Sequence, residues 1–326
     1  MSTAVALAHP NIALVKYWGK RDERLALPAT GSLSLTLDVA PTRTSVALAP
    51  GAGRDEARWA EGPMSAGEAA RISTFLDLVR ERAGSRVPAV VETVNEIPTG
   101  AGLASSAAGF AALAAAAAAA YGLHPDPREL SRLARRGSGS AARSVFGGFV
   151  QWHAGRDDHG SYAEPVPAGE FRIALVVAVL AAGRKAVGSR EAMRRTVQTS
   201  PYYPAWVEHV PRDLREMRLA VERGDFTAVG ELAESNALRM HATMLGAVPP
   251  VRYWNPDTVA ALDLVAAMRE EGLEAYATMD AGPNVKVLCL PRDAEAVRAR
   301  IAGALPAADV LVSGHGPGVR LLEGGA

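Results

Sequence analysis

Residues 98–109, PTGAGLASSAAG, combine glycines and serines in a pattern that suits the binding of a phosphate group. The glycines let the main chain approach an anion closely, and the small side chains leave room for it. An alanine-rich run follows, so we expect a helix to begin near Ser105, where N–H groups and the helix dipole favour an anion. The segment is neither GxGxxG nor Walker A, because no Lys follows the last Gly. The alternative is a glycine-rich turn that opens a buried helix.

A second group of reactive side chains lies in NIALVKYWGKRD, residues 11–22. Along a strand Asn11 and Lys16 need not share a face, whereas Lys20 can follow a turn at the end of the strand. The hydroxyl of Tyr17 beside two ammonium groups would suit an anionic, polyphosphorylated small molecule. The alternative is an edge strand with solvated lysines.

Lysine is scarce in this chain, because 31 of its 35 basic residues are Arg. Where Arg is used so heavily, a retained Lys can mark a position that needs a compact ammonium. Chance would also account for so few residues, which are Lys16, Lys20, Lys185 and Lys286.

Residues 135–144, RRGSGSAARS, offer the hydroxyls of Ser138 and Ser140 and, one helical turn later, the guanidinium of Arg143. A guanidinium can bind a carboxylate through two N–H groups, which an ammonium cannot do. The alternative is a capped helix start with Ser140 as the N-cap.

Asp280 lies in MDAGPN, between an expected strand and a Gly-Pro turn. Such an Asp is often only a turn residue that accepts hydrogen bonds from its own backbone. In a chain that also offers phosphate-binding segments, it could be the carboxylate that phosphoryl transfer to an alcohol requires.

The histidines lack the spacing of a zinc site, since no HxxxH or HExxH occurs. His241 is expected to be a core histidine, and a helix face beside the site is the alternative. The segment SGHGPG around His315 is expected to be a surface loop.

The composition is that of an ordinary globular protein, with 48% hydrophobic and 21% charged residues in 326. The formal net charge is zero, so nothing indicates a nucleic-acid or anionic-membrane partner. Cys289 is the single cysteine, which excludes an internal disulfide and a cysteine-based zinc site. No basic and then apolar leader opens the sequence, and the longest apolar tract, residues 107–121, is too short to span a bilayer. We expect a cytoplasmic protein.

The length suggests about two domains, and a break in the hydrophobic pattern places the boundary near residue 170, which gives residues 1–170 and 171–326. Before residue 170 the pattern predicts three strands, an exposed connection at 51–64, a helix at 66–83, a strand at 87–94 and helices at 107–121 and from Asp126. After residue 170 it predicts a buried strand, four amphipathic helices, two paired strands around residues 281–283 and a last helix from Asp293.

These segments together resemble the diphosphomevalonate decarboxylases, which belong to the superfamily of galactokinase, homoserine kinase, mevalonate kinase and phosphomevalonate kinase (the GHMP kinases). The resemblance spans nearly the whole chain in the same order, and VKYWGKRD with RRGSGSAARS is specific to the decarboxylase branch. A departure is ATG at residues 29–31, where many relatives carry a more polar residue beside the serine. The resemblance implies an α+β protein with a ribosomal-protein-S5-like domain, then a ferredoxin-like domain, and the active-site cleft between them.

The activity that the resemblance implies is an ATP- and Mg²⁺-dependent step of the mevalonate pathway of isoprenoid biosynthesis. It turns mevalonate 5-diphosphate into isopentenyl diphosphate, ADP, phosphate and CO₂. Homodimers are the family expectation. The alternatives are a phosphomevalonate decarboxylase or a mevalonate 3-kinase on the same scaffold, or a non-catalytic metabolite-binding regulator.

The resemblance also implies roles for single residues. Arg143 would bind the substrate carboxylate, Asp280 would lie against the 3-hydroxyl, and Lys16 would lie near that Asp and the transferred phosphate. The other substrate-binding residues would be Asn11, Tyr17, Lys20, Ser138, Ser140, Ser189 and Arg190. The ATP phosphates would be bound by Pro98, Gly100, Ala101, Gly102, Leu103, Ala104, Ser105 and Ser106, with Ser106 near Mg²⁺.

Overall fold

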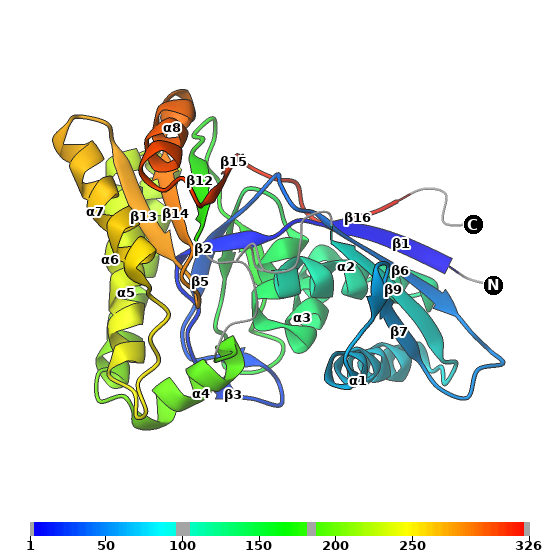
Figure 1. Ribbon diagram of the computed structural model, residues 1–326. Coiled ribbons are helices and arrows are strands. Elements are labelled where there is room, and N and C mark those ends of the chain that lie inside the picture. The colour runs from blue at the N-terminus through cyan, green and yellow to red at the C-terminus, as the bar shows by residue number, and fades with distance from the viewer. Residues whose placement is uncertain (1–2, 96–104, 181–186, 323–326) are drawn as a thin grey trace.

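The computed structural model describes residues 3–95, 105–180 and 187–322, which form two lobes of mixed helices and strands (Figure 1). One lobe is built mainly from residues before 150 and the other mainly from residues after 174. The predicted α+β class is confirmed.

The first lobe contains a sheet to which both ends of the chain contribute. Its strands are β1 (Thr3–Ala8), β6 (Thr42–Leu48), β7 (Glu56–Trp59), β8 (Gly62–Pro63), β9 (Ala89–Asn95) and β16 (Arg320–Leu321). They lie in the order β16-β1-β6-β9-β7-β8, and all neighbours are antiparallel except β7 and β9. Because β16 pairs with β1, the end of the chain returns to the first lobe.

Three helices complete this lobe: α1 (Ala66–Ala83), α2 (Ser105–Ala120) and α3 (Pro127–Gly137). Helix α2 is apolar on nearly every side and almost fully buried, as expected for a helix without a polar face. Its alanines pack with Ala6 and Val46 of the sheet and with Phe75 and Val79 of α1 in one core. The short side chains let the backbone of α2 lie close to the sheet, which fixes the position of the first turn of α2.

A second sheet lies where the two lobes meet. It has the order β11-β10-β5-β2, from β2 (Asn11–Val15), β5 (Ser32–Thr36), β10 (Phe149–Trp152) and β11 (Ala163–Pro165). A small hairpin of β3 (Lys20–Asp22) and β4 (Leu27–Pro28) follows β2. The 3₁₀ helix η1 (Gly139–Val145) connects α3 to the strand β10. This sheet and the elements joined directly to it therefore carry two of the predicted site segments, 11–22 and 135–144.

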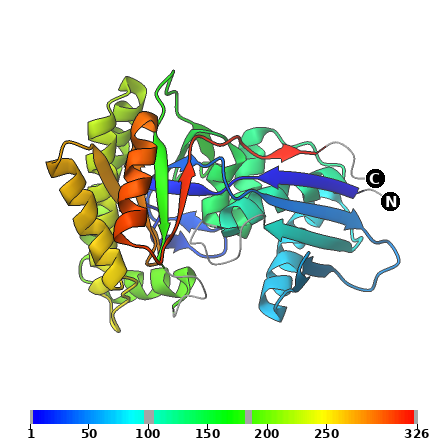
Figure 2. The same cartoon turned by 45° about the horizontal axis from the view of Figure 1, so that its top comes forward.

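The second lobe has an antiparallel sheet in the order β13-β14-β12-β15. Its strands are β12 (Ala174–Val179), β13 (Ala275–Met279), β14 (Val285–Cys289) and β15 (Asp309–Ser313). Its helices are α4 (Ser189–Thr199), α5 (Tyr203–Arg223), α6 (Phe226–Leu245), α7 (Pro256–Glu270) and α8 (Ala294–Ala304). Helices α5 to α8 gather on the side of the molecule away from the first lobe (Figures 1 and 2).

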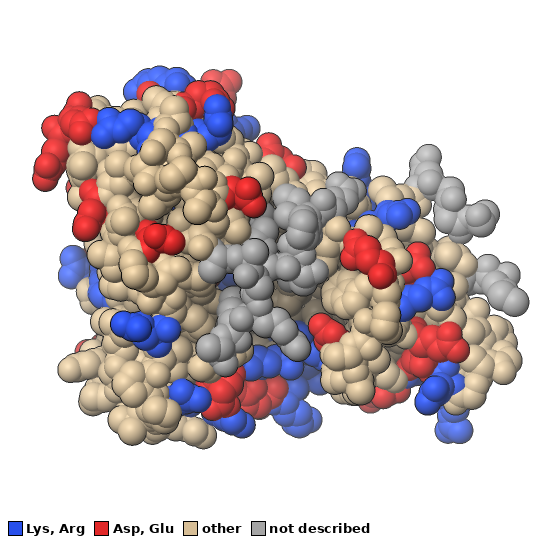
Figure 3. All heavy atoms as spheres, viewed as in Figure 1, with Lys and Arg blue, Asp and Glu red and all other residues tan. Residues whose placement is uncertain are grey.

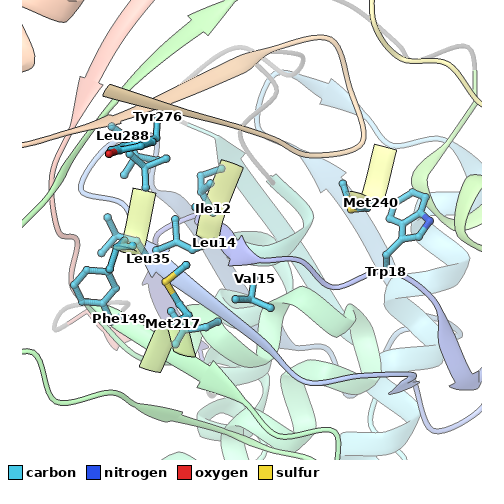
Figure 4. Close-up of a cluster of buried hydrophobic side chains, with 14 of the residues drawn as sticks. Ile12, Leu14, Val15, Trp18, Leu35, Phe149, Met217, Met240, Tyr276 and Leu288 are labelled. Atoms are coloured by element: carbon cyan, nitrogen blue, oxygen red, sulfur yellow. The ribbon is translucent and has the colours of Figure 1, made fainter. Parts of the chain in front are cut away.

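Strand β12 is buried on both faces, as its continuous apolar sequence predicts. Val176 packs with α7 and α8, whereas Leu175 and Val177 point to the opposite face and join a different core. That second core also contains Ile12 and Leu14 of β2, and Figure 4 shows these side chains beside Met217 of α5, Tyr276 and Leu288. One continuous core thus joins β2 to the second lobe and fixes the end of β2 relative to the end of β13.

Most predicted elements are present, with three differences. The polar segment 51–64 contains β7 and β8, which were not predicted because their own sequence does not favour strands; β7 is stabilised by pairing with β9, and β8 by pairing with β7. The segment around His315 is a loop as predicted, but it is half-buried and not at the surface, since His315 accepts a hydrogen bond from the N–H of Ile173 and Gly316 packs against the backbone of Leu37. The short strands β1 and β16 were also missed. The domain boundary near residue 170 stays a prediction.

Among the described residues, no helix combines the length and the apolar character needed to cross a membrane.

Candidate active site

A cavity of about 800 Å³ opens between the lobes, within the usual size of a small-molecule site. Both lobes line it, since α1 and η1 contribute on one side and α4 and the turn after β13 on the other. The predicted site residues that line it are Asn11, Lys16, Tyr17, Lys20, Ser106, Ser138, Ser140, Arg143, Ser189, Arg190 and Asp280. Ser105 is the first residue of α2, and Pro98, Gly100, Ala101, Gly102, Leu103 and Ala104 lie outside the described residues.

Lys16 and Asp280 meet in this cavity. The Nζ atom of Lys16 is 2.9 Å from Oδ1 of Asp280 and 2.6 Å from the carbonyl oxygen of Ala13. Lys16 is 1% exposed and Asp280 31% exposed, so the ammonium is buried and the carboxylate faces the cavity. Burial lowers the pKa of Lys16 to about 8, although the Asp280 carboxylate opposes this shift. The predicted contact between the two halves of the chain is confirmed.

The backbone of Lys16 is held by the second lobe. The pairing of β2 with β5 shifts register between Ala13 and Val15, just before Lys16. The N–H of Lys16 donates to Oδ1 of Asn236 on α6 at 2.8 Å, and Nδ2 of Asn236 donates to Oδ2 of Asp213 at 2.7 Å. A chain of buried polar groups therefore fixes the point at which Lys16 leaves its strand.

Asp213 is 1% exposed on α5, and it also accepts hydrogen bonds from Arg239 at 3.0 and 3.1 Å. We expect Asp213→Ala to lower the free energy of unfolding by about 1–3 kcal/mol, because it leaves the Asn236 amide buried without its acceptor. Urea unfolding measures this, with the exposed Asp263→Ala on α7 as the control. A change as small as that of the control would contradict the structural role.

Arg143 is 2% exposed and lies on η1. Its Nε and Nη2 donate to Oδ1 of Asn11 at 3.2 and 3.0 Å, and its Nη1 donates to Ser32. Asn11 in turn donates to the carbonyl oxygen of Ser140 and to Ser144. Within the described residues, three of the five guanidinium N–H groups are used, which leaves two for a ligand.

Three serine hydroxyls gather in the cavity that Arg143 also lines. Oγ of Ser138 lies 3.5 Å from that of Ser106 and 3.4 Å from that of Ser140. The alternative reading of Ser140 as a helix N-cap is wrong, because Ser138 precedes η1 and makes no side-chain cap bond. A Cβ atom at Gly139 would lie 2.8 Å from Oη of Tyr17, so a glycine is needed for Tyr17 to lie here.

Tyr17 presents its hydroxyl to the same group of residues. Its ring lies edge-on to Trp152, with 4.8 Å between the ring centres, and the hydroxyl has no partner in the described part of the chain. Burial raises the pKa of Tyr17, so the hydroxyl stays protonated and able to donate a hydrogen bond. Lys20 is paired with Glu23 at 2.5 Å at the edge of the cavity.

Helix α4 brings Ser189 and Arg190 to the opposite wall. Ser189 is the first residue of α4, and Arg190 donates to the carbonyl oxygen of Gly137 at 3.4 Å. Arg71, which the sequence reading missed, donates to the same oxygen at 2.8 Å and lies over the ring of Phe110. Its position in the sequence could have indicated a site residue, because Arg71 is a basic residue at the edge of the apolar face of α1, four residues before Phe75.

The described lining of the cavity is strongly basic. Seven cationic side chains line it against two carboxylates, those of Glu23 and Asp280; the seven are Lys16, Lys20, Arg24, Arg71, Arg136, Arg143 and Arg190. Figure 3 shows Lys and Arg at the lower junction of the lobes, with Asp and Glu side chains beside them on the outer surface. Because positive charge in a cleft concentrates anions, the geometry suits a polyphosphate ligand.

His241 belongs both to the core and to the site surroundings. It is 2% exposed on α6, its ring lies 5.3 Å from that of Trp254, and it makes a hydrogen bond to the backbone of Asp280. Burial lowers the pKa of His241 to about 3, so the ring is neutral near pH 7. We therefore expect His241 to support the backbone that carries Asp280.

The family models of known proteins match most of the chain. Residues 8–163 match the diphosphomevalonate decarboxylase-like N-terminal domain, and residues 175–315 match the mevalonate 5-diphosphate decarboxylase C-terminal domain. The chain belongs to the diphosphomevalonate decarboxylase family. A curated diphosphomevalonate decarboxylase of Eremothecium gossypii is 38% identical over 93% of this chain and 81% of its own length.

Solved structures of the family share the whole fold. The mevalonate diphosphate decarboxylase from Enterococcus faecalis, in a structure described by its mevalonate diphosphate mediated ATP binding, is 43% identical with a TM-score of 0.92. A structure described as MDDEF in complex with MVAPP, AMPPCP and magnesium is 44% identical with a TM-score of 0.93. Each alignment covers 99% of both chains. The GHMP kinase-like fold expected from the sequence is thereby confirmed.

Proposed function

We propose that this protein is an ATP-dependent decarboxylase that converts mevalonate 5-diphosphate into isopentenyl diphosphate, ADP, phosphate and CO₂. The observation that carries the proposal is the Lys16–Asp280 pair, 2.9 Å apart, inside a basic cavity between the lobes. Family membership and the relatives that bind mevalonate diphosphate and ATP support it.

The two substrates are assigned to different walls of the cavity. The diphosphate of mevalonate 5-diphosphate fits the group formed by Tyr17, Lys20, Ser138, Ser140, Ser189 and Arg190, which offers hydroxyl and cationic donors. The ATP phosphates fit the N-terminal end of α2, where Ser106 is exposed to the cavity. The predicted loop of residues 98–104 would complete that site.

The residues present also fit magnesium that enters with the nucleotide. No group of three His, Cys, Asp or Glu that could hold a metal occurs among the described residues. Mg²⁺ commonly takes its ligands from substrate phosphates, water and one or two protein oxygens, and the Ser106 hydroxyl can supply one. When bound, it would neutralise charge on the phosphate groups.

Asp280 would act on the 3-hydroxyl of the substrate. A tertiary hydroxyl leaves poorly until it is phosphorylated, so its proton must be accepted or oriented while the phosphoryl group is transferred. The Asp280 carboxylate faces the cavity and can do this, while the Lys16 ammonium beside it can stabilise the transferred phosphate. Once the 3-phosphate departs with that proton, Asp280 is ionised, and its carboxylate stabilises the positive charge that develops on carbon.

Arg143 would align the substrate carboxylate for loss of CO₂. Asn11 and Ser32 fix the plane of its guanidinium, and two N–H groups remain for a bidentate contact in the described surroundings. Alignment of the breaking C–C bond with the leaving phosphate is a positioning effect.

The pKa of Lys16 gives a pH prediction. Because Lys16 must be protonated to face a phosphate and burial lowers its pKa to about 8, we expect kcat/KM to fall as pH rises through about 8. Lys16→Arg keeps the charge at higher pH, so its residual activity should lack this alkaline limb. An identical limb in the Arg variant would assign it to another group.

The products formed from different substrates distinguish the proposed activity from the related activities on the same scaffold. With mevalonate, its 5-phosphate and its 5-diphosphate as alternative substrates, we expect CO₂ release to be fastest with the diphosphate. Preference for the monophosphate would identify a phosphomevalonate decarboxylase, ADP without CO₂ a mevalonate 3-kinase, and neither product a non-catalytic binder. The seven cations around the cavity favour the diphosphate.

A homodimer and a cytoplasmic location complete the proposal. Light scattering of the purified protein tests the first, and cell fractionation tests the second. The single, buried Cys289 is compatible with a reducing compartment.

A further inference from the structure

Lys286 is a buried lysine that the mechanism above does not use. It is 2% exposed on β14, between the apolar residues Val285 and Val287, and it pairs across the sheet with Thr278 of β13. Burying an ammonium is costly unless an opposite charge or good acceptors compensate for it. Its Nζ atom lies 3.6 Å from Oδ2 of Asp280 and 3.4 Å from the carbonyl oxygen of Asn284.

Asp280 is therefore flanked by two ammonium groups, one at each oxygen. Lys16 contacts Oδ1 and comes from the end of β2, whereas Lys286 approaches Oδ2 from the same hairpin that carries Asp280. The two lysines differ in what else they can reach, because Lys16 lines the cavity and Lys286 does not. Lys16 can turn to a phosphate, whereas the contacts of Lys286 are with the Asp280 carboxylate and the carbonyl oxygen of Asn284.

We propose that Lys286 is a positioning residue that keeps the Asp280 carboxylate ionised and oriented while Lys16 interacts with the transferred phosphate. This inference rests on the proposed function of Asp280. During the reaction the Asp280 carboxylate and the transferred phosphate both attract the Lys16 ammonium. Because Lys286 also interacts with the carboxylate, Lys16 can contact the phosphate without leaving the carboxylate unpaired. The Lys286–Asp280 contact lies within one β-hairpin, so it is kept even if the lobes move relative to each other.

The surroundings of Asp280 make the effect measurable as a pH dependence. Within residues 3–95, 105–180 and 187–322, the charged and titratable groups found around it are Lys16 after β2, Lys286 on β14, Arg143 on η1 and the neutral His241 on α6. Removing the Lys286 charge makes protonation of Asp280 easier, which moves the acidic limb of the activity profile to higher pH. It also removes a charge that lowers the pKa of Lys16, so the alkaline limb moves to higher pH as well.

The test compares pH profiles of kcat for CO₂ release in the wild type and in Lys286→Gln, with mevalonate 5-diphosphate and ATP. We expect Lys286→Gln to lower kcat about 10- to 100-fold, to shift both limbs upward by about one pH unit, and to leave both KM values within about threefold. Lys286→Arg, which restores the charge, should bring the acidic limb back. Thr278→Val, the cross-strand neighbour with an apolar replacement of the same shape, should leave the profile unchanged.

Three outcomes would overturn the proposal: an active Lys286→Gln enzyme with an unshifted profile, the same shift in Thr278→Val, or no recovery in a folded Lys286→Arg. If Lys286→Gln does not fold, Lys286→Met replaces it, because an apolar side chain can be buried without hydrogen-bond partners. The same loss of kcat and the same shifts of the pH profile are expected for Lys286→Met. Failure of the wild type to release CO₂ would instead refute the decarboxylase function.

Discussion

Asp280→Asn is expected to lower kcat for CO₂ release by about 10³-fold or more while the protein stays folded. The amide keeps the shape of the side chain, but it cannot accept the proton of the 3-hydroxyl or stabilise positive charge on carbon. Positioned acid–base groups contribute typically about 10²- to 10⁴-fold, and Asp280 would supply electrostatic stabilisation in addition.

The control for this variant is Asp263→Asn, the same substitution at an exposed position of α7. Circular dichroism and thermal unfolding establish that both variants fold. Turnover of Asp280→Asn within about tenfold of the control would show that the carboxylate is not needed for the reaction.

Arg143→Ala is expected to lower kcat by a similar factor through loss of substrate alignment. Misplacement of a reacting group by about 1 Å can cost about 10²-fold, and here the whole anchor of the carboxylate is removed. Arg143→Lys keeps the charge but not the planar fork that Asn11 and Ser32 fix, so we expect it to recover only a small part of the activity.

The measurement is simultaneous detection of ADP and CO₂, with Arg212→Ala as the matched control, because Arg212 lies on the exposed face of α5 and contacts Glu216. Arg143→Ala also removes the hydrogen bonds that Arg143 donates to Asn11, so the free energy of unfolding of this variant is measured as well. Near wild-type CO₂ release in folded Arg143→Ala would contradict the alignment role.

The sequence predicted the elements best where local signals agree. Helix α1 has the predicted bounds because Ser65 and Glu68 form a capping box before an apolar face of Ile72, Phe75 and Leu76. The strands β7 and β8 were missed for the opposite reason, since their polar sequence forms strands only because β7 pairs with β9 and β8 pairs with β7.

The site was predicted in part by resemblance and could not have been derived from spacing. Lys16 and Asp280 are 264 positions apart, and only the shared core of β2 and the second lobe brings them together. Lys286 is a site residue that the sequence did not predict, because in the run VKVLC it is only one polar residue within an expected buried strand. The scarcity of lysine was its only sequence signal, and Asn236 and Asp213 gave none, since their link to the Lys16 backbone is purely tertiary.

The central claim is that phosphorylation and loss of CO₂ occur together on one substrate at the Asp280–Lys16 pair. A single-turnover experiment with carboxyl-labelled mevalonate 5-diphosphate, excess enzyme and ATP measures both products in the same quenched samples. We predict about one CO₂ and one phosphate per ADP, with all three reduced to background in Asp280→Asn. ADP formed without CO₂, or label released at an unchanged rate by the Asn variant, would contradict the account.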